Sequence, residues 1–158
     1  MYTSIKHLSL CIMATLMLFT TAPTEAVAKK KMLPKAYIFG FSASFNDSIV
    51  YMTNVQQVDS IWIDSKTKFL LGRSLYTLQL KNYFSEQGEP RRTCLVVYGL
   101  TRKEAEKKFL KMKKLYTVKS PGRYEVKYIQ DDEFRFQPVD MSDPVYTEEE
   151  EEDVNGQQ

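Results

Sequence analysis

The chain has 158 residues, with 22 Lys and Arg against 20 Asp and Glu, one histidine and two cysteines. Removal of residues 1–28, argued next, would take away His7 and Cys11 and leave Cys94 alone. This composition excludes an intramolecular disulfide, histidine-dependent serine or cysteine nucleophiles, and zinc sites built from histidine and several cysteines. We therefore assign no catalytic, cofactor-binding or metal-ligating residue and expect no cofactor.

Residues 1–28 predict a cleavable secretory signal peptide. Residues 8–19 are apolar and uncharged, and this run is shorter than the ~20 residues of a membrane-spanning helix. Ala26 and Ala28 supply the small side chains that signal peptidase needs before its cleavage site, and three lysines follow from Lys29. We expect an exported protein, in the periplasm, the cell envelope or the secreted fraction, with no transmembrane segment after cleavage.

The rest of the chain predicts one domain with an acidic end. We expect a basic linker over residues 29–35, a single α+β domain over residues 36–140, and an extended segment with a disordered acidic tail over residues 141–158. Residues 29–146 hold 21 Lys and Arg against 13 Asp and Glu, whereas residues 148–153 are six consecutive acids. The chain is thus a basic domain followed by an acidic tail.

The first part of the domain predicts two or three strands. Residues 36–45 alternate so that Tyr37, Phe39 and Phe41 share one face of a strand. Residues 49–53 predict a second strand after a turn, and residues 60–64 either continue it or form a third.

Residues 66–85 predict the first helix, which begins at Arg73 if Gly72 interrupts it. The apolar positions at helical spacing are Leu71, Leu75 and Leu78, widened by Tyr76, Leu80, Tyr83 and Phe84. Residues 93–98 form a short continuous apolar run, which is typical of a central strand buried on both faces.

Thr101 and Glu104 form a capping box, which predicts the start of the second helix. Its expected buried stripe is Ala105, Phe109, Met112 and Tyr116. Residues 124–129 alternate and predict a further strand, and residues 134–136 predict a short edge strand.

These elements predict a two-layer α+β fold of order ββ(β)αβαβ. We expect a mixed sheet of four or five strands with both helices on one face. The last strand–helix–strand unit is expected to cross over with the right hand.

The strongest candidate binding surface lies on the second predicted helix. Four lysines oppose its apolar stripe, namely Lys103, Lys107, Lys111 and Lys114. Such a stripe can bind phosphates or other anionic groups, and the competing interpretation is an ordinary solvated helix face. The acidic run at residues 148–153 either covers these lysines or serves as a solubilising end.

Three further residues are candidates for contact or modification. Trp62 is the best single exposed aromatic for stacking on a partner such as a sugar. Ser48 and Ser60 each lie between an aspartate and an isoleucine, a triplet that resembles the O-glycosylation acceptor of exported proteins in some Gram-negative anaerobes.

Two patterns bear on catalysis, and both are weak. Residues 65–68 match S-x-x-K, but the S-D-N and K-T-G elements that accompany it in penicillin-binding enzymes are absent. Asp59 and Asp64 are five residues apart, and an odd spacing on a strand directs two carboxylates to opposite faces. Cys94 lies inside an apolar run and is predicted to be buried and inert.

The chain resembles a group of short exported proteins of Gram-negative gut anaerobes in three segments, AYIFGFSASFNDSIVY, DSKTKFLLGRSLYTLQL and RRTCLVVYGLTRKEAEKKFLKMKK. The resemblance spans most of residues 36–140 and implies export, but it transfers no site and no activity. Residues 93–129 also resemble, in element order and helix pattern, one βαβ half of the peptidoglycan-binding SPOR fold.

The leading hypothesis is a non-catalytic periplasmic or envelope module that binds a protein or glycan partner. The alternative is a small hydrolase that acts through carboxylates. A concave pocket with two convergent acids would favour the enzyme, whereas a basic or aromatic surface would favour binding. Export argues against nucleic acid as a partner.

The signal peptide leads to a direct prediction. N-terminal sequencing of the exported protein should begin at Lys29, because Ala26 and Ala28 provide the small pair beside the charge boundary. Recovery of a chain that still begins at Met1 from the membrane fraction would contradict this expectation.

Overall fold

The computed structural model describes residues 29–142, so the predicted signal peptide and acidic tail lie outside the described residues. The strands are β1 (Lys30–Ala43), β2 (Ile49–Thr53), β3 (Gln56–Asp64), β4 (Thr93–Gly99) and β5 (Glu125–Ile129), and the helices are α2 (Arg73–Glu86) and α3 (Arg102–Thr117). This arrangement confirms the predicted α+β class, the mixed sheet and the order βββαβαβ.

The long strand β1 lies at the centre of the sheet. One edge of β1 pairs antiparallel with β3 along residues 30–38 and with β2 along residues 41–43. Its other edge pairs antiparallel with β4, and β5 adds in parallel to the free edge of β2. The predicted linker over residues 29–35 is wrong, because residues 30–35 already belong to β1 and lie beside β3.

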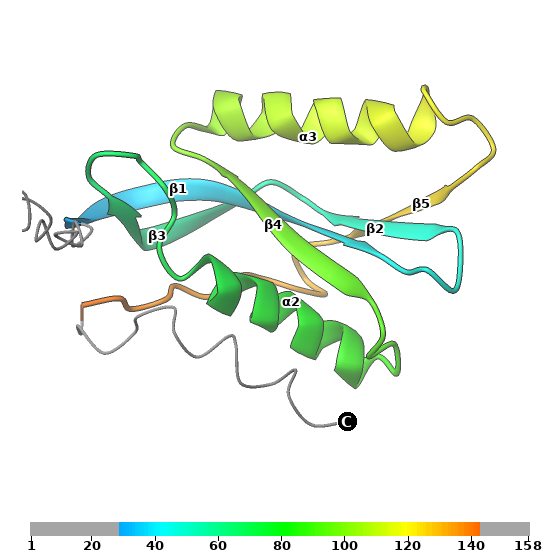
Figure 1. The fold of residues 1–158 in the computed structure, drawn as a ribbon, viewed down its shortest axis with the longest axis horizontal. Helices are drawn as coiled ribbons and strands as arrows, with labels where there is room; N and C mark the ends of the chain where they lie inside the picture. The colour runs from blue at the N-terminus through cyan, green and yellow to red at the C-terminus, as the bar shows by residue number, and fades with distance from the viewer. Residues whose placement is uncertain (1–28, 143–158) are drawn as a thin grey trace, which may run out of the picture.

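The two helices lie on opposite faces of the sheet, which gives three layers (Figure 1). The prediction of two layers with both helices on one face is therefore wrong. The reason is visible in β1, where Ile38 packs in the same core as α2 and its neighbour Phe39 packs in a second core with α3. Because both faces of β1 are apolar, each face needs its own helix.

The core on the α2 side contains three aromatic and aliphatic side chains of that helix, Tyr76, Leu80 and Phe84. They are the residues that sequence periodicity placed only at the margin of the stripe. Leu78, expected at its centre, is exposed. Gly72 adopts a left-handed conformation with φ of 66° and directly precedes the helix, so Leu71 lies outside it.

The core on the α3 side is aromatic. Phe109 meets Phe39 edge to face at 5.3 Å between ring centroids, and Tyr116 meets Phe41 at 4.9 Å. Ala105 is fully buried, and Met112 packs against the same cluster. The predicted stripe of this helix therefore faces the sheet, with Ala105 buried and Phe109, Met112 and Tyr116 half-buried.

Strand β4 is an edge strand, since β1 is its only partner among the described strands. The prediction of a central strand is wrong, although both faces of β4 are covered because α2 and α3 each pack against it. Two carbonyl groups of β4 accept hydrogen bonds from basic side chains. Arg73 donates to the carbonyl of Val96, and Lys108 donates to that of Tyr98. Charged side chains on an edge oppose pairing with another chain.

The segment after β5 closes the α2 side of the sheet without forming a strand. The predicted strand over residues 134–136 is wrong, because this segment is bound by the side chain of Gln56 and not by the backbone hydrogen bonds of a neighbouring strand. The Gln56 amide donates to the carbonyl of Phe134 and accepts from the backbone N–H of Phe136. Gln79 and Tyr76 of α2 accept from the N–H groups of Gln137 and Val139, and Lys30 donates to the carbonyl of Met141, so the segment runs past α2 to the start of β1.

The capping box of α3 gives a stability prediction. Thr101 Oγ1 accepts from the N–H of Glu104 at 3.2 Å, and Glu104 Oε2 accepts from the N–H of Leu100 at 3.0 Å. Thr101→Ala should lower the free energy of unfolding by roughly 0.5–2 kcal/mol, because it removes an N-cap acceptor. Urea denaturation measures the effect, and Thr101→Ser, which keeps the hydroxyl, is the control. Equal midpoints for the alanine variant and the parent would contradict this role.

Candidate functional site

Helix α3 presents its four candidate lysines to solvent. Lys103, Lys107, Lys111 and Lys114 are all exposed, and we call them the lysine face. Burial of Ala105 and Phe109 against the sheet turns the opposite side of the helix outward. Within residues 29–142, no carboxylate forms an ion pair with any of the four.

The acidic residues of α3 are already paired with other basic residues. Glu104 binds Lys108 at 2.7 Å, and Glu106 binds Arg102 at 3.5 Å. The hydrogen bond from Lys108 is the main cause that lowers the pKa of the Glu104 carboxyl. These pairs leave the lysine face without a compensating charge on its own helix.

Sequence reasoning missed three aliphatic side chains that lie among these lysines. The exposed fractions are 61% for Leu110, 48% for Leu115 and 66% for Val118. Their spacing of three or four residues from the lysines was the available signal. The lysine face is therefore mixed, cationic and apolar.

The other candidates lie on different elements. Trp62 is half-buried on β3, across from the exposed Met32 of β1. Ser48 is exposed in the turn before β2, and Ser60 is exposed on β3 with a left-handed φ of 54°. None of the three is on α3, so the sequence-predicted residues do not form a single site.

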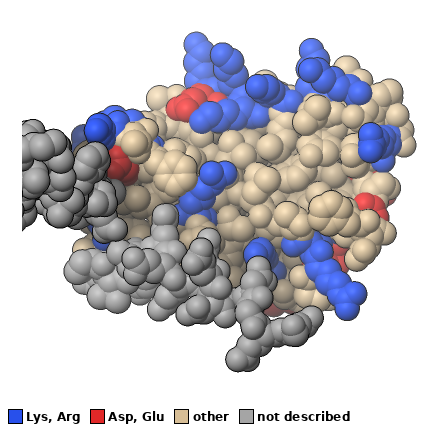
Figure 2. All heavy atoms as spheres, in the orientation of Figure 1, with Lys and Arg blue, Asp and Glu red and all other residues tan. Residues whose placement is uncertain are grey.

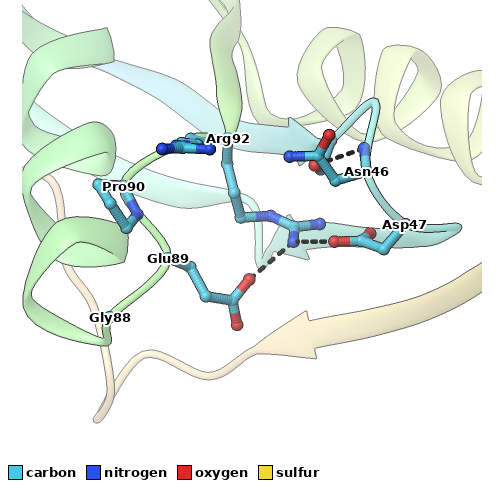
Figure 3. Close-up of a pocket in the computed structure, with 8 residues that line it drawn as sticks. Asn46, Asp47, Gly88, Glu89, Pro90 and Arg92 are labelled. Atoms are coloured by element: carbon cyan, nitrogen blue, oxygen red, sulfur yellow. Dashed lines mark hydrogen bonds and ion pairs between the residues drawn. The ribbon is translucent and has the colours of Figure 1, made fainter.

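A hollow of about 280 Å³ lies between the β1–β2 turn and the loop that leads from α2 to β4 (Figure 3). Two acidic residues, Asp47 and Glu89, line it and point toward the guanidinium of Arg92. Arg92 Nη1 is 3.1 Å from Asp47 and 2.7 Å from Glu89.

Arg92 links the elements around this hollow. Its side chain is buried and also donates to Ser42 Oγ and to the carbonyl of Ile49. Its guanidinium lies 4.6 Å from the ring centroid of Tyr51. The two acids thus converge on a buried cation that holds the β1–β2 turn against β4, rather than on an open reaction space.

A second hollow, of about 360 Å³, lies at the outer edge of β3. Asp59 and Asp131 line it together with Arg102 and Arg135. Asp131 Oδ1 accepts from two side-chain amides, those of Asn54 and Gln56, and Oδ2 lies 3.6 Å from Arg135. Most of the hydrogen-bonding capacity of this carboxylate is therefore used within the protein.

The S-x-x-K segment lies in the turn after β3 and not on a helix. Asp64 organises this turn by accepting from the N–H groups of Lys66 and Thr67 and from the hydroxyl of Thr67. These bonds, chiefly the one from the Thr67 backbone, lower the pKa of the Asp64 carboxyl. Asp64 thus has a structural role, and the one-turn helical spacing that the pattern requires is absent.

The described chain contains neither a metal-binding cluster nor a membrane-spanning helix. No group of three or more Asp, Glu, Cys or His side chains within residues 29–142 could hold a metal ion. In the same range, neither helix is long and apolar enough to cross a membrane.

Comparisons with protein-family models, with curated proteins and with solved structures found no match for this chain.

Cys94 provides a test of the core on the α2 side. Its thiol is buried, and burial raises its pKa, so it stays protonated near neutral pH. Ellman's reagent should react slowly with the native protein lacking residues 1–28 and fully after unfolding in guanidinium. Because Cys94 is the only cysteine after residue 28, the absorbance reports this position alone. Rapid reaction of the native protein would contradict the buried assignment.

Proposed function

We propose that the protein is a non-catalytic module of the periplasm or cell envelope that binds an anionic partner through the lysine face of α3. The observation that carries this proposal is the set of four exposed lysines with no ion-pair partner in residues 29–142. The partner classes expected from the sequence, an envelope protein or a glycan, both include strongly anionic members.

The distribution of charge supports this use of α3. Exposed lysines spaced along one helix produce a local positive potential that attracts polyanions at long range. At ~0.15 M ionic strength this attraction extends about 8 Å. A partner therefore needs several anionic groups spread over a distance similar to the length of the helix, as in an acidic polysaccharide or a charged surface.

The position of the C-terminal segment also favours an accessible lysine face. Val139 donates to the hydroxyl of Tyr76 on α2, and Met141 is held by Lys30. The described chain thus runs on the α2 side of the sheet, opposite α3 (Figure 1). The acidic run lies outside the described residues, and within residues 29–142 the four lysines are exposed.

The alternative function is a carboxylate-dependent hydrolase acting in the hollow beside β3, where Asp59 and Asp131 occur together. Glycoside hydrolysis needs one carboxyl that donates a proton and one that acts as base or nucleophile. The two hydrogen bonds and the ion pair that already engage Asp131 weigh against this alternative.

Charge reversal on α3 tests the proposed function. The exported chain should bind heparin resin, and Lys107→Glu with Lys114→Glu should elute at clearly lower salt because two of the four cations of the lysine face are lost. Lys35→Glu with Lys81→Glu, on β1 and α2, makes the same change in net charge at exposed positions and should elute close to the parent. Equal elution of the two double variants would show that only net charge matters and would overturn the proposal.

A further inference from the structure

The lysine face carries more apolar surface than an ordinary solvated helix face. Leu110, Leu115 and Val118 are about half or more exposed, and none of them belongs to either core. The buried side of α3 is already filled by its own stripe, in which Ala105 is fully buried. These three side chains therefore add nothing to the packing of α3 on the sheet.

The aliphatic residues and the lysines share one side of the helix. The positions are separated by three or four residues along the stripe Lys103, Lys107, Leu110, Lys114 and Val118. Residues so spaced lie on the same helix face. Lys111 and Leu115 continue the neighbouring row, so cationic and apolar groups are mixed over the C-terminal part of the face, from Leu110 onward.

The orientation of α3 presents this face as an outer surface. Contacts of Phe39 and Phe41 with the helix fix it along the sheet. Figure 2 shows lysine and arginine side chains projecting along the margin of the molecule that α3 forms, with uncharged surface between them. Figure 1 shows the helix lying lengthwise along the sheet, and the four lysines and three aliphatic side chains are all exposed.

We infer that this face docks on an anionic lipid surface, with the lysines at the phosphate headgroups and the aliphatic side chains at the headgroup–acyl boundary. The inference rests on the proposed function and names its partner class. Membrane-surface helices combine basic residues with apolar ones, and their binding grows with both. A soluble acidic glycan complements the lysines but leaves the three aliphatic side chains in water.

The apolar packing of α3 on the sheet limits how the helix meets a bilayer. Phe109 and Met112 are committed to the core on that side, so they are not free to enter lipid. Contact is restricted to the outward face, which makes the docking peripheral and reversible. Salt should therefore weaken it, because the lysines supply much of the attraction.

Vesicle sedimentation with the exported chain tests the inference. The protein should sediment with vesicles of phosphatidylcholine and phosphatidylglycerol and stay in solution with phosphatidylcholine alone. Leu110→Ser with Val118→Ser should weaken binding to the anionic vesicles by roughly tenfold, through lost apolar burial. The same variant should elute from heparin resin at the salt concentration of the parent, because its charge is unchanged.

A matched variant controls for general loss of apolar surface. Met32 and Leu78 are exposed by 54% and 49% and lie on β1 and α2. Met32→Ser with Leu78→Ser should bind the anionic vesicles as the parent does. Thermal unfolding of both double variants, followed by circular dichroism, should match the parent because all four positions are exposed.

The outcomes separate this inference from the proposed function. Binding to heparin without binding to anionic vesicles would overturn the lipid inference and leave a soluble anionic partner. Equal vesicle binding by the parent and Leu110→Ser with Val118→Ser would show that the aliphatic side chains take no part, which would also overturn the inference. Heparin elution that is insensitive to Lys107→Glu with Lys114→Glu would overturn the proposed function itself.

Discussion

Alternation of side chains along β1 is the constraint on which the described structure depends. Ile38 faces the core shared with α2, and Phe39 faces the core shared with α3. Gly40 of β1 donates its N–H to the side-chain oxygen Oγ1 of Thr53. A Cβ added at Gly40 would lie 2.7 Å from Cδ2 of Leu80 on α2. A side chain at this position would displace Leu80, so glycine allows the sheet to lie this close to α2. One strand thus sets the three layers and the spacing of one helix.

The orientation of α3 follows from the same constraint, and so does the surface proposed to bind a partner. Phe39 offers an edge-to-face contact that only one side of the helix can fill, and Phe109 fills it. The side of α3 opposite Phe109 must then face water. The lysine face is therefore positioned by packing at the centre of the sheet, while its own side chains contribute nothing to the core.

Patterns among residues close together in sequence predicted the helices and strands well. The features that these patterns did not predict depend on pairing between residues far apart in sequence. The capping box at Thr101 and the stripe through Phe109 lie within a few residues, so periodicity alone located α3. The placement of β4 at an edge depends on pairing with β1, whose partner residues lie 50 to 62 positions away in sequence. Arg92 likewise meets Asp47 across 45 residues, and no spacing rule anticipates that contact. The candidate lysines were predictable from spacing, whereas the exposure of Leu110 and Val118 depends on how α3 packs, which spacing alone does not give.

The use of acidic residues inside the domain explains where the surplus positive charge appears. Glu89 and Asp47 neutralise the buried Arg92, and Glu104 and Glu106 neutralise basic neighbours on α3. Each of these acids is committed to a cation that it holds in place. The lysine face receives none of them, so its charge stays concentrated on one helix instead of being cancelled locally. A surface with unpaired cations and exposed aliphatic side chains gains most from a partner that offers both anionic groups and an apolar layer.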